Sequence, residues 1–130
     1  MNTTLQQQFL AQIHELSGLL KYTEPTMGML VKAIFIASAR WRGGASFAYC
    51  EDYTFQRFSW RVKDDLAPKC RLDRAWQLLA TSIPLGMHLF HELDVSAHDP
   101  DNQGQVDGFI ARLAWTGFDP RFYMRQPATD

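Results

Sequence analysis

Apolar residues near the start of the chain recur at helical spacing. They are separated by four, four, three and four positions: Leu5, Phe9, Ile13, Leu16 and Leu20. This spacing places the apolar side chains on one face of a helix, and we predict that the helix covers residues 3–22. The connection that follows, Thr23 to Pro25, is short, so we expect this helix and the next one to form an antiparallel hairpin.

A longer apolar run, over residues 27–39, is interrupted only by Lys32 and Ser38. These two polar residues lie about 120° apart on a helix, since each residue advances by about 100°, so they do not form a polar face. A helix that is apolar all round needs burial on every side. A proline is tolerated in its first turn and a glycine pair can end it. We therefore predict a central helix over residues 25–42, around which the rest of the chain packs.

Residues 45–66 support two interpretations. Their many aromatic residues and a partial alternation indicate a β-hairpin at 46–62, which would make the fold α+β. Helical spacing is present in the second half of the segment, at Phe55, Phe58, Val62 and Leu66. An isolated two-stranded hairpin is only marginally stable. We therefore predict an irregular aromatic segment up to Glu51 and a helix over residues 52–66 with Asp52 as its N-cap, and keep the hairpin as the alternative.

Helical periodicity returns over residues 73–94, where Asp73 is a suitable N-cap. Pro84 removes one backbone hydrogen bond and clashes with the carbonyl of Ala80. We therefore expect this helix to kink at the proline or to split in two. The polar stretch at 95–104 is rich in turn residues and predicts a loop.

A last amphipathic segment predicts a helix over residues 105–117, closed by Gly117. The chain of 130 residues is about one domain, and it is long enough to bury a core without disulfides or a structural metal. We therefore predict a single, mainly α-helical globular domain over residues 1–130, with four or five helices.

Composition and cysteine usage bear on where the protein works. Apolar residues make up 46% of the chain and charged residues 21%, which is typical of a globular protein. The first residues lack the basic and apolar regions of a secretory signal, and the run at 27–39 is too short to cross a bilayer. Cys50 and Cys70 have neither metal-binding spacing nor a cysteine-rich context. We therefore expect reduced thiols in a cytoplasmic protein with no membrane partner.

Positive charge is concentrated in residues 40–74. The net charge of the chain is −1, but this segment holds eight Lys or Arg residues against five Asp or Glu residues. Basic and aromatic residues are interleaved in it, and the candidate binding residues are Arg40, Trp41, Arg42, Arg57, Trp60, Arg61, Lys63, Arg71 and Arg74. Guanidinium groups pair with phosphates and exposed rings stack on bases, so this pattern suits single-stranded nucleic acid. It suits an acidic protein partner equally well, because Trp and Arg are enriched at binding hot spots.

The segment from residue 99 to residue 107 resembles the calcium loop of an EF-hand. Oxygen-bearing side chains stand at positions one, three, five and nine of the loop: Asp99, Asp101, Gln103 and Asp107. Gly104 stands at position six, as the family requires. Position twelve, where the family has a bidentate glutamate, is Ile110, so we expect weak calcium binding at most. The competing interpretation is a solvated loop in which Asp107 caps the next helix.

A second candidate metal site lies near the end of the 73–94 helix. His88, His91 and Glu92 are close together on the helix surface. His98 follows in the predicted loop, so two or three of these side chains could bind zinc. The spacing differs from that of metalloprotease zinc motifs. Surface histidines at a helix C-terminus, where positive charge is favourable, are the simpler explanation.

No catalytic signature accompanies these residues. The serines lie in no nucleophile-elbow sequence, no glycine-rich phosphate loop is present, and Cys50 lacks a signature that would pair it with a histidine. Aromatic residues make up 13% of the chain and include four Trp, more large apolar groups than one compact core conceals. We therefore expect a non-enzymatic interaction or regulatory protein without a cofactor, which acts on a protein partner through an aromatic and basic surface. A homodimer is one arrangement that would cover that surface. Nucleic-acid binding at residues 40–74 and weak calcium binding at 99–107 are the alternatives.

Overall fold

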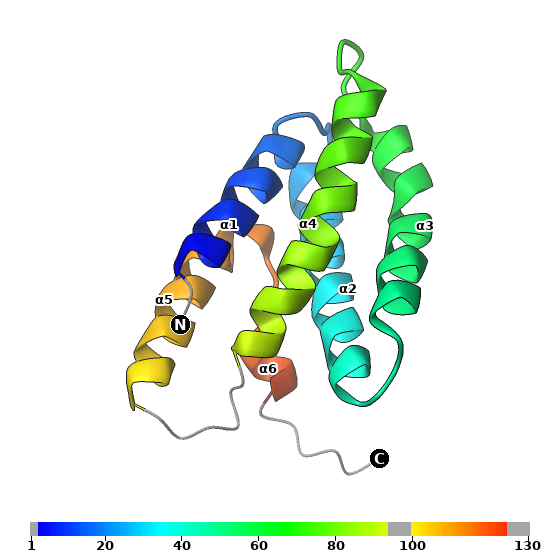
Figure 1. Cartoon of the computed structure of the whole chain (residues 1–130). Coiled ribbons are helices and arrows are strands. Elements are labelled where there is room, and N and C mark those ends of the chain that lie inside the picture. The colour runs from blue at the N-terminus through cyan, green and yellow to red at the C-terminus, as the bar shows by residue number, and fades with distance from the viewer. Residues whose placement is uncertain (1–2, 94–99, 125–130) are drawn as a thin grey trace.

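The computed structural model describes residues 3–93 and 100–124, and helices account for most of them (Figure 1). In chain order the elements are α1 (Thr3–Ser17), α2 (Thr23–Arg42), α3 (Phe47–Asp65), α4 (Leu72–Glu92), α5 (Pro100–Leu113), the 3-10 helix η1 (Ala114–Thr116) and α6 (Pro120–Met124). These two stretches contain no strand and no helix with the length and apolarity needed to cross a membrane. The prediction of a mainly α-helical fold is therefore confirmed, and the alternative hairpin at 46–62 is wrong.

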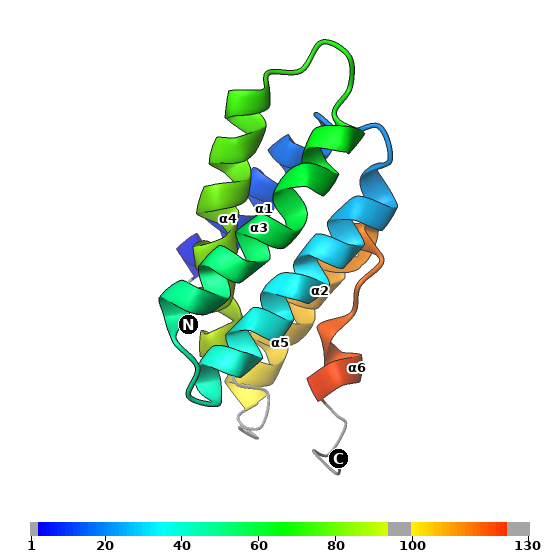
Figure 2. The same cartoon turned by 90° about the vertical axis from the view of Figure 1, so that its right-hand side faces the viewer.

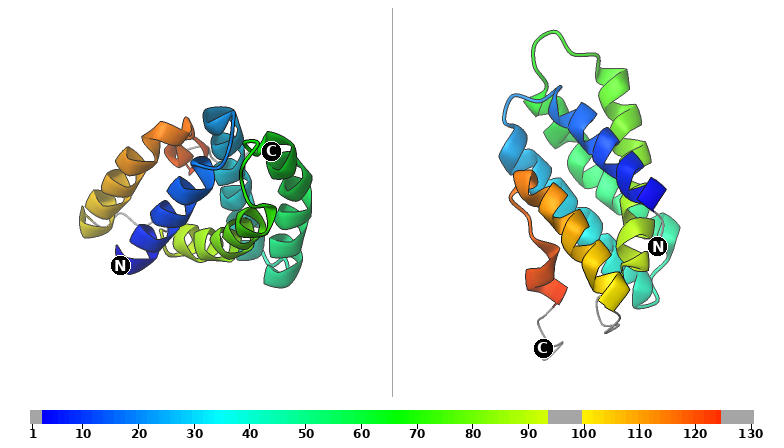
Figure 3. Two further views of the ribbon diagram at one scale, coloured as in Figure 1. Left: turned by 90° about the horizontal axis from the view of Figure 1, so that it is seen from above. Right: turned by 90° about the vertical axis from the view of Figure 1, so that its left-hand side faces the viewer.

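α4 packs against α1, α2 and α3 (Figure 1). α2 contacts α3 and η1 in addition, and α5 and α3 lie on opposite sides of the molecule when it is seen from above (Figure 3). α1 ends at Ser17, before its predicted end at residue 22. It runs opposite to α2, but it packs mainly on α4. The centre of the fold is therefore the pair α2 and α4 rather than α2 alone.

Aromatic side chains from three helices meet in the core. The rings of Phe9, Phe90 and Phe109 lie with their centroids 5.8 to 6.3 Å apart. α4 comes very close to α1 and α2 at Gly86, where an added Cβ would lie 2.6 Å from atoms of both Ile34 and Phe9. Interiors are packed too densely to absorb such an overlap, so the close approach of these helices depends on the glycine.

The burial of α2 differs from the prediction. Seven of its residues are buried: Thr26, Met27, Leu30, Val31, Ile34, Ala37 and Ser38. Met29 is 42% exposed, and Ala33 and Ile36 are half-buried. The prediction that α2 is buried on every side is therefore wrong, because no helix in the described part of the chain covers the stripe that carries these three residues.

α3 begins at Phe47, before its predicted start. Its N-cap is Ser46, whose Oγ accepts a hydrogen bond of 3.3 Å from the backbone N–H of Tyr49. That bond satisfies one of the amide groups that have no partner at a helix start. The predicted irregular segment up to Glu51 and the predicted N-cap at Asp52 are therefore wrong. The aromatic residues indicated a strand, but strand propensity depends strongly on tertiary context.

Two further boundary predictions need correction. α4 is one continuous helix with Pro84 inside it, so the predicted split is wrong, whereas the predicted kink at Pro84 stays a prediction. Packing against three other helices outweighs the loss of one backbone hydrogen bond. The predicted loop at 95–104 is wrong for its last residues, since α5 begins at Pro100. α5 itself ends at Leu113 and η1 continues to Thr116, so Gly117, with a φ of 79°, closes the helical stretch as predicted.

Candidate functional site

Two hollows lie between α2 and α3 on the outer side of this helix pair. The two helices lie side by side and run antiparallel (Figure 2). Residues three or four positions apart share one stripe of a helix surface. The stripe on α3 consists of Tyr49, Tyr53, Arg57 and Trp60, and the stripe on α2 of Pro25, Ala33, Ile36 and Arg40, all of which line a hollow. Met29 lines neither hollow, but helical spacing places it between Pro25 and Ala33 on the α2 stripe. We refer to the space between these stripes as the α2–α3 groove, and it contains two hollows.

The first hollow lies at the Arg40 end of the groove. It is lined by Ala33, Ile36, Ala37, Arg40, Tyr49, Cys50, Tyr53, Thr54 and Arg57. Its volume of about 80 Å³ is well below the roughly 300–1,000 Å³ of small-molecule pockets. It can therefore hold one side chain or a small anion rather than a whole organic cofactor.

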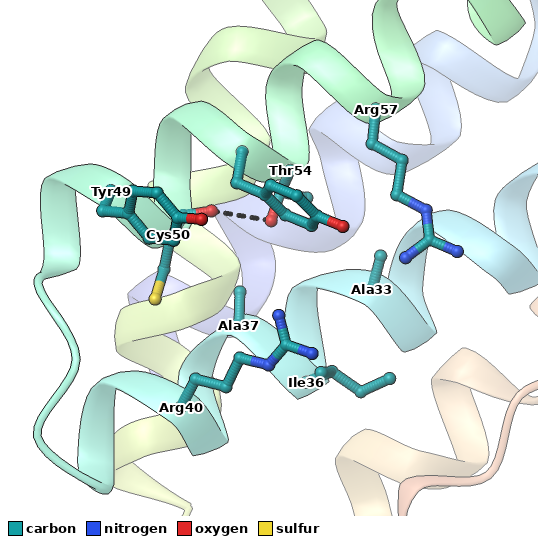
Figure 4. Close-up of a pocket in the computed structure, with 9 residues that line it drawn as sticks. Ala33, Ile36, Ala37, Arg40, Tyr49, Cys50, Thr54 and Arg57 are labelled. Atoms are coloured by element: carbon teal, nitrogen blue, oxygen red, sulfur yellow. Dashed lines mark hydrogen bonds between the residues drawn. The ribbon is translucent and has the colours of Figure 1, made fainter.

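Small and already bonded side chains form the floor of the first hollow. Ala33 and Ala37 leave space between the two helices, and Cys50 is buried. The hydroxyl of Thr54 donates a hydrogen bond of 2.8 Å to the carbonyl of Cys50 (Figure 4). Because the Thr54 hydroxyl already donates its hydrogen to this carbonyl, a bound group would contact mainly apolar atoms on the floor.

Two arginines supply the charge of the first hollow. Arg40 extends from α2 and Arg57 from α3, and both side chains reach into the space between the helices (Figure 4). Neither guanidinium forms a hydrogen bond or an ion pair with any of the described residues. The described lining also contains no carboxylate. The hollow therefore has a positive potential, which favours an anionic ligand.

Exposed tyrosines border the same hollow. Tyr49 and Tyr53 are one turn apart on α3, and their rings stack with centroids 6.1 Å apart. They are 65% and 45% exposed, so a ligand can reach their rings. Tyrosine combines a large apolar surface with a polar end, and for this reason it is enriched at binding interfaces.

A second and more open hollow lies at the other end of the groove. It has a volume of about 440 Å³ and is lined by Tyr22, Pro25, Thr26, Trp60, Arg61, Asp64 and Asp65. Trp60 is 61% exposed. The buried carboxylate of Asp65 accepts hydrogen bonds of 3.0 Å from the Tyr22 amide and from the Thr26 hydroxyl. These bonds hold the start of α2 against the end of α3, so the base of this hollow is fixed.

The structure brings some of the predicted binding residues together and separates others. Four of them line the groove: Arg40, Arg57, Trp60 and Arg61. Lys63 and Arg71 are exposed but line neither hollow. Three make contacts elsewhere within the chain: Trp41, Arg42 and Arg74.

Trp41 belongs to an aromatic cluster outside the groove. Its ring centroid lies 4.8 Å from that of Phe47 and 5.1 Å from that of His88. The ring of His91 is also close, at 4.4 Å. This packing joins the end of α2 to the start of α3 and the end of α4. Because neighbouring rings cover Trp41, it does not form an exposed platform for bases.

Arg42 and Arg74 bind groups of the chain itself. Nη2 of Arg42 donates hydrogen bonds to the carbonyls of Phe90 (3.1 Å) and His91 (2.8 Å), at a helix end where carbonyls lack partners. Arg74 donates from Nε to Oε2 of Glu15 (2.5 Å) and from Nη2 to Oε1 (2.6 Å). This hydrogen bonding lowers the pKa of Glu15 and raises the pKa of Arg74. Both arginines thus hold helices together.

The zinc hypothesis finds no support in the described residues. His88 and His91 pack against Trp41. Within residues 3–93 and 100–124, no group of three His, Cys, Asp or Glu side chains is placed to hold a metal ion. His98, which completed the predicted set, lies outside the described residues.

The EF-hand-like segment has a different backbone from the one that the resemblance implies. Residues 100–107 form the first turns of α5, whereas a calcium loop turns sharply at its glycine. Asp107 lies on that helix, and its Oδ1 is 3.4 Å from Nη1 of Arg121. The other predicted ligands lie outside what the structure describes: Asp99 and the side chains of Asp101 and Gln103. Weak calcium binding stays a prediction, without the loop geometry on which it rested.

Sequence reasoning missed several residues of the groove. The aromatic content of the α3 segment indicates a hairpin or a core, yet Tyr49 and Tyr53 are exposed and share one helix stripe with the predicted Trp60. Ala33 and Ile36 continue the stripe on α2. The spacing is present in the sequence, but it can be interpreted only once residues 47–65 are known to be helical.

Similarity to known proteins does not identify the site. A scan against protein-family models, a search of curated proteins and a search of solved structures each find no match. The function is therefore inferred from the groove itself.

Proposed function

We propose that this protein is a non-catalytic interaction protein whose α2–α3 groove binds an apolar and negatively charged segment of a partner protein. One observation carries the proposal: a single groove combines exposed apolar side chains with two arginines that have no partner among the described residues. Exposed apolar surface bordered by polar groups is typical of interaction sites. Cys50 and Cys70 are free thiols, which supports a place in the reducing cytosol.

Apolar contact supplies the affinity in this proposal. Met29, Tyr53 and Trp60 expose large apolar side chains along the groove, and covering apolar surface contributes about 25 cal/mol per Å². An amphipathic helix that lies in a groove between two helices buries such residues with anchors at helical spacing. From Pro25 to Arg40 the α2 stripe is roughly 22 Å long, at 1.5 Å per residue. A partner helix of about 15 residues would fill it.

Charge decides which segments bind. Arg40 and Arg57 would face the bound segment, so an anionic group opposite them is favoured and a cationic one is repelled. A symmetric dimer in which the two grooves run parallel would place the two arginine pairs opposite each other. An anionic segment of a different protein places the opposite charge there, so we favour it over a second copy of the chain. A dimer that dissociates on Trp60→Ala in sedimentation velocity would reverse this choice.

A peptide selection tests the proposal. Random peptides long enough to fill the groove are displayed on phage and selected on the immobilised protein, and affinities of the enriched peptides are measured by fluorescence anisotropy. We expect enriched sequences with apolar residues at helical spacing together with Asp or Glu. If no peptide is enriched, the proposal is wrong.

Variants of exposed aromatic residues locate the bound peptide. Tyr53→Ala and Trp60→Ala should each weaken binding by at least about tenfold, because aromatic anchors dominate interface energies. Phe122→Ala is the matched control, since it removes an aromatic side chain that is 64% exposed but belongs to α6. Equal affinity of all three variants would show that the peptides bind outside the groove.

Single-stranded nucleic acid is the second candidate ligand. It is favoured by the stacked pair of Tyr49 and Tyr53 next to Arg40 and Arg57, because such pairs stack on bases beside phosphate contacts. Affinity for a fluorescent oligothymidine should then fall steeply with salt, since each phosphate contact releases counterions. Tyr49→Ala should also weaken binding of the oligothymidine, because it removes one of the two stacking rings. Failure to bind at low salt would remove this candidate.

A further inference from the structure

We infer that Arg40 and Arg57 bind a phosphorylated side chain, so that phosphorylation of the partner segment strengthens its binding to the α2–α3 groove. The inference rests on the proposed function and specifies the negative charge that the groove recognises.

Charge balance favours a phosphoryl group over a carboxylate. Two guanidinium groups line the first hollow, and its described lining has no carboxylate to neutralise them. A phosphorylated side chain carries a charge of about −1.5 to −2 at pH 7 and three acceptor oxygens. A glutamate or aspartate carries a single charge, so it would leave one of the two arginines without a counterion.

The arrangement of the donors suits the three oxygens of a phosphoryl group. Arg40 reaches the hollow from α2 and Arg57 reaches it from α3 (Figure 4), so they approach a bound group from different helices. A guanidinium pairs with phosphate through two parallel N–H groups. Tyr49 and Tyr53 line the same hollow and carry hydroxyl groups that can donate as well.

The size of the first hollow matches this group. The hollow has a volume of about 80 Å³, which is space for one small group rather than for a whole organic ligand. A phosphoryl group with its ester oxygen is a group of this kind.

The second hollow is a poor site for the same ligand. Arg61 lines it together with Asp64 and Asp65, whose carboxylates repel a phosphate. Arg42 and Arg74 are bound to groups of the chain. The pair formed by Arg40 and Arg57 is thus the arginine pair of the groove that can accept an anion.

The experiment uses the whole protein and four matched peptide libraries. Each library has randomised flanks and one fixed central residue, which is phosphoserine, phosphothreonine, phosphotyrosine or glutamate. We expect the phosphoserine or phosphothreonine library to give ligands at least about tenfold tighter than their glutamate counterparts. Their affinity should fall between pH 7.5 and pH 5, because the phosphoryl group loses its second charge with a pKa of about 6. Inorganic phosphate should compete only weakly, because it cannot contact the rest of the groove.

Variants that remove one arginine charge test whether the phosphopeptides bind in the first hollow. Arg40→Gln and Arg57→Gln should each weaken the phosphopeptides by at least about tenfold, while Arg71→Gln, an exposed arginine outside the groove, should leave the affinity unchanged. Equal affinity of phosphopeptides and glutamate peptides, or equal losses in all three variants, would overturn the inference. In that case the proposed function still stands if unmodified peptides bind and Trp60→Ala weakens them. If inorganic phosphate binds as tightly as any peptide, the ligand is a free anion and both proposals fail.

Discussion

The carboxylate of Asp65 accepts a hydrogen bond of 3.0 Å from the hydroxyl of Thr26. The same carboxylate accepts a second bond from the amide of Tyr22, and the Asp65 carbonyl accepts one of 2.8 Å from the amide of Lys21. The last residue of α3 thereby holds the first turn of α2. Since these two helices form the walls of the groove, this junction fixes their spacing at the end that contains Trp60.

Removal of the Asp65 carboxylate should therefore destabilise the fold. Asp65→Ala leaves the buried Thr26 hydroxyl and the half-buried Tyr22 amide without their acceptor, and we expect a loss of about 1–3 kcal/mol in the free energy of unfolding. Asp64→Ala changes an exposed neighbour and should stay within about 0.5 kcal/mol. Urea unfolding at pH 7 compares the two variants. Equal losses would mean that the junction adds nothing to stability.

Arg42 should contribute to the stability of the fold, whereas Arg40 should contribute to peptide binding. Arg42→Ala removes the donor that caps the carbonyls of Phe90 and His91, so we expect a loss of about 1–2 kcal/mol in stability. Arg40→Ala should leave stability within about 0.5 kcal/mol and weaken peptide binding instead. Thermal unfolding and anisotropy on the same two proteins measure both effects. A destabilised Arg40→Ala would assign that side chain a structural role.

Helices α1 and α4 could be predicted from sequence, because each shows an apolar repeat at helical spacing. α2 has no such repeat and could be predicted from the length of its apolar run, which exceeds that of an ordinary strand. The start of α3 could not be predicted in the same way. Its first turns carry aromatic residues with high strand propensity, and the deciding feature is a local hydrogen bond between Ser46 and Tyr49. The presence of a helix in this segment could therefore be predicted, whereas the residue at which it begins could not.

The groove was only partly predictable, for a different reason. Arg40, Arg57 and Trp60 were candidates from the basic segment, and the structure places them exposed in the lining of the groove. The same composition also contains Arg74, which pairs with Glu15, 59 positions away in sequence. Composition cannot separate a cation that faces solvent from one that binds another helix, since that difference arises only when distant segments pack.

Two helical glycines should respond in opposite ways to alanine. In α2, a Cβ at Gly28 would lie 2.5 Å from the backbone carbonyl oxygen of Thr116, so Gly28→Ala should cost about 1–3 kcal/mol through overpacking. In α5, a Cβ at Gly108 would meet nothing within 4 Å. Gly108→Ala should therefore stabilise the protein by about 0.5–1 kcal/mol, as expected from helix propensity. Chemical unfolding measures both, and a neutral Gly28→Ala would show that η1 can move away from α2.

The ion pair of Glu15 and Arg74 should make stability depend on pH. Hydrogen bonding to Arg74 lowers the pKa of Glu15 in the folded protein. A carboxyl with a lowered pKa contributes stability above its unfolded value of about 4.3, and this contribution is lost as the pH falls through the folded value. The stability difference between the wild type and Glu15→Gln should therefore be largest near neutral pH and vanish in acid.

Salt provides the control for this prediction. The two side chains are 42% and 45% exposed, so added salt should screen their attraction and reduce the difference at neutral pH. A carbon-detected NMR titration follows the carboxyl directly. Arg74→Gln should return the pKa of Glu15 to the ordinary glutamate range, and an unchanged titration would exclude Arg74 as the cause.

Phe58 and Trp60 lie two positions apart on α3 and should separate core packing from ligand binding. Phe58 is 3% exposed and Trp60 is 61% exposed. Phe58→Ala removes a buried ring and should cost about 3–5 kcal/mol in stability. Trp60→Ala should change stability by no more than about 0.5 kcal/mol, because its ring lies mostly in solvent. Its effect should appear in the affinity of selected peptides, where loss of an aromatic anchor costs about 2 kcal/mol or more. Thermal unfolding and anisotropy on the same preparations make the comparison. If Trp60→Ala unfolds the protein as readily as Phe58→Ala, the tryptophan is a structural residue, and the α2–α3 groove loses the anchor at one of its ends.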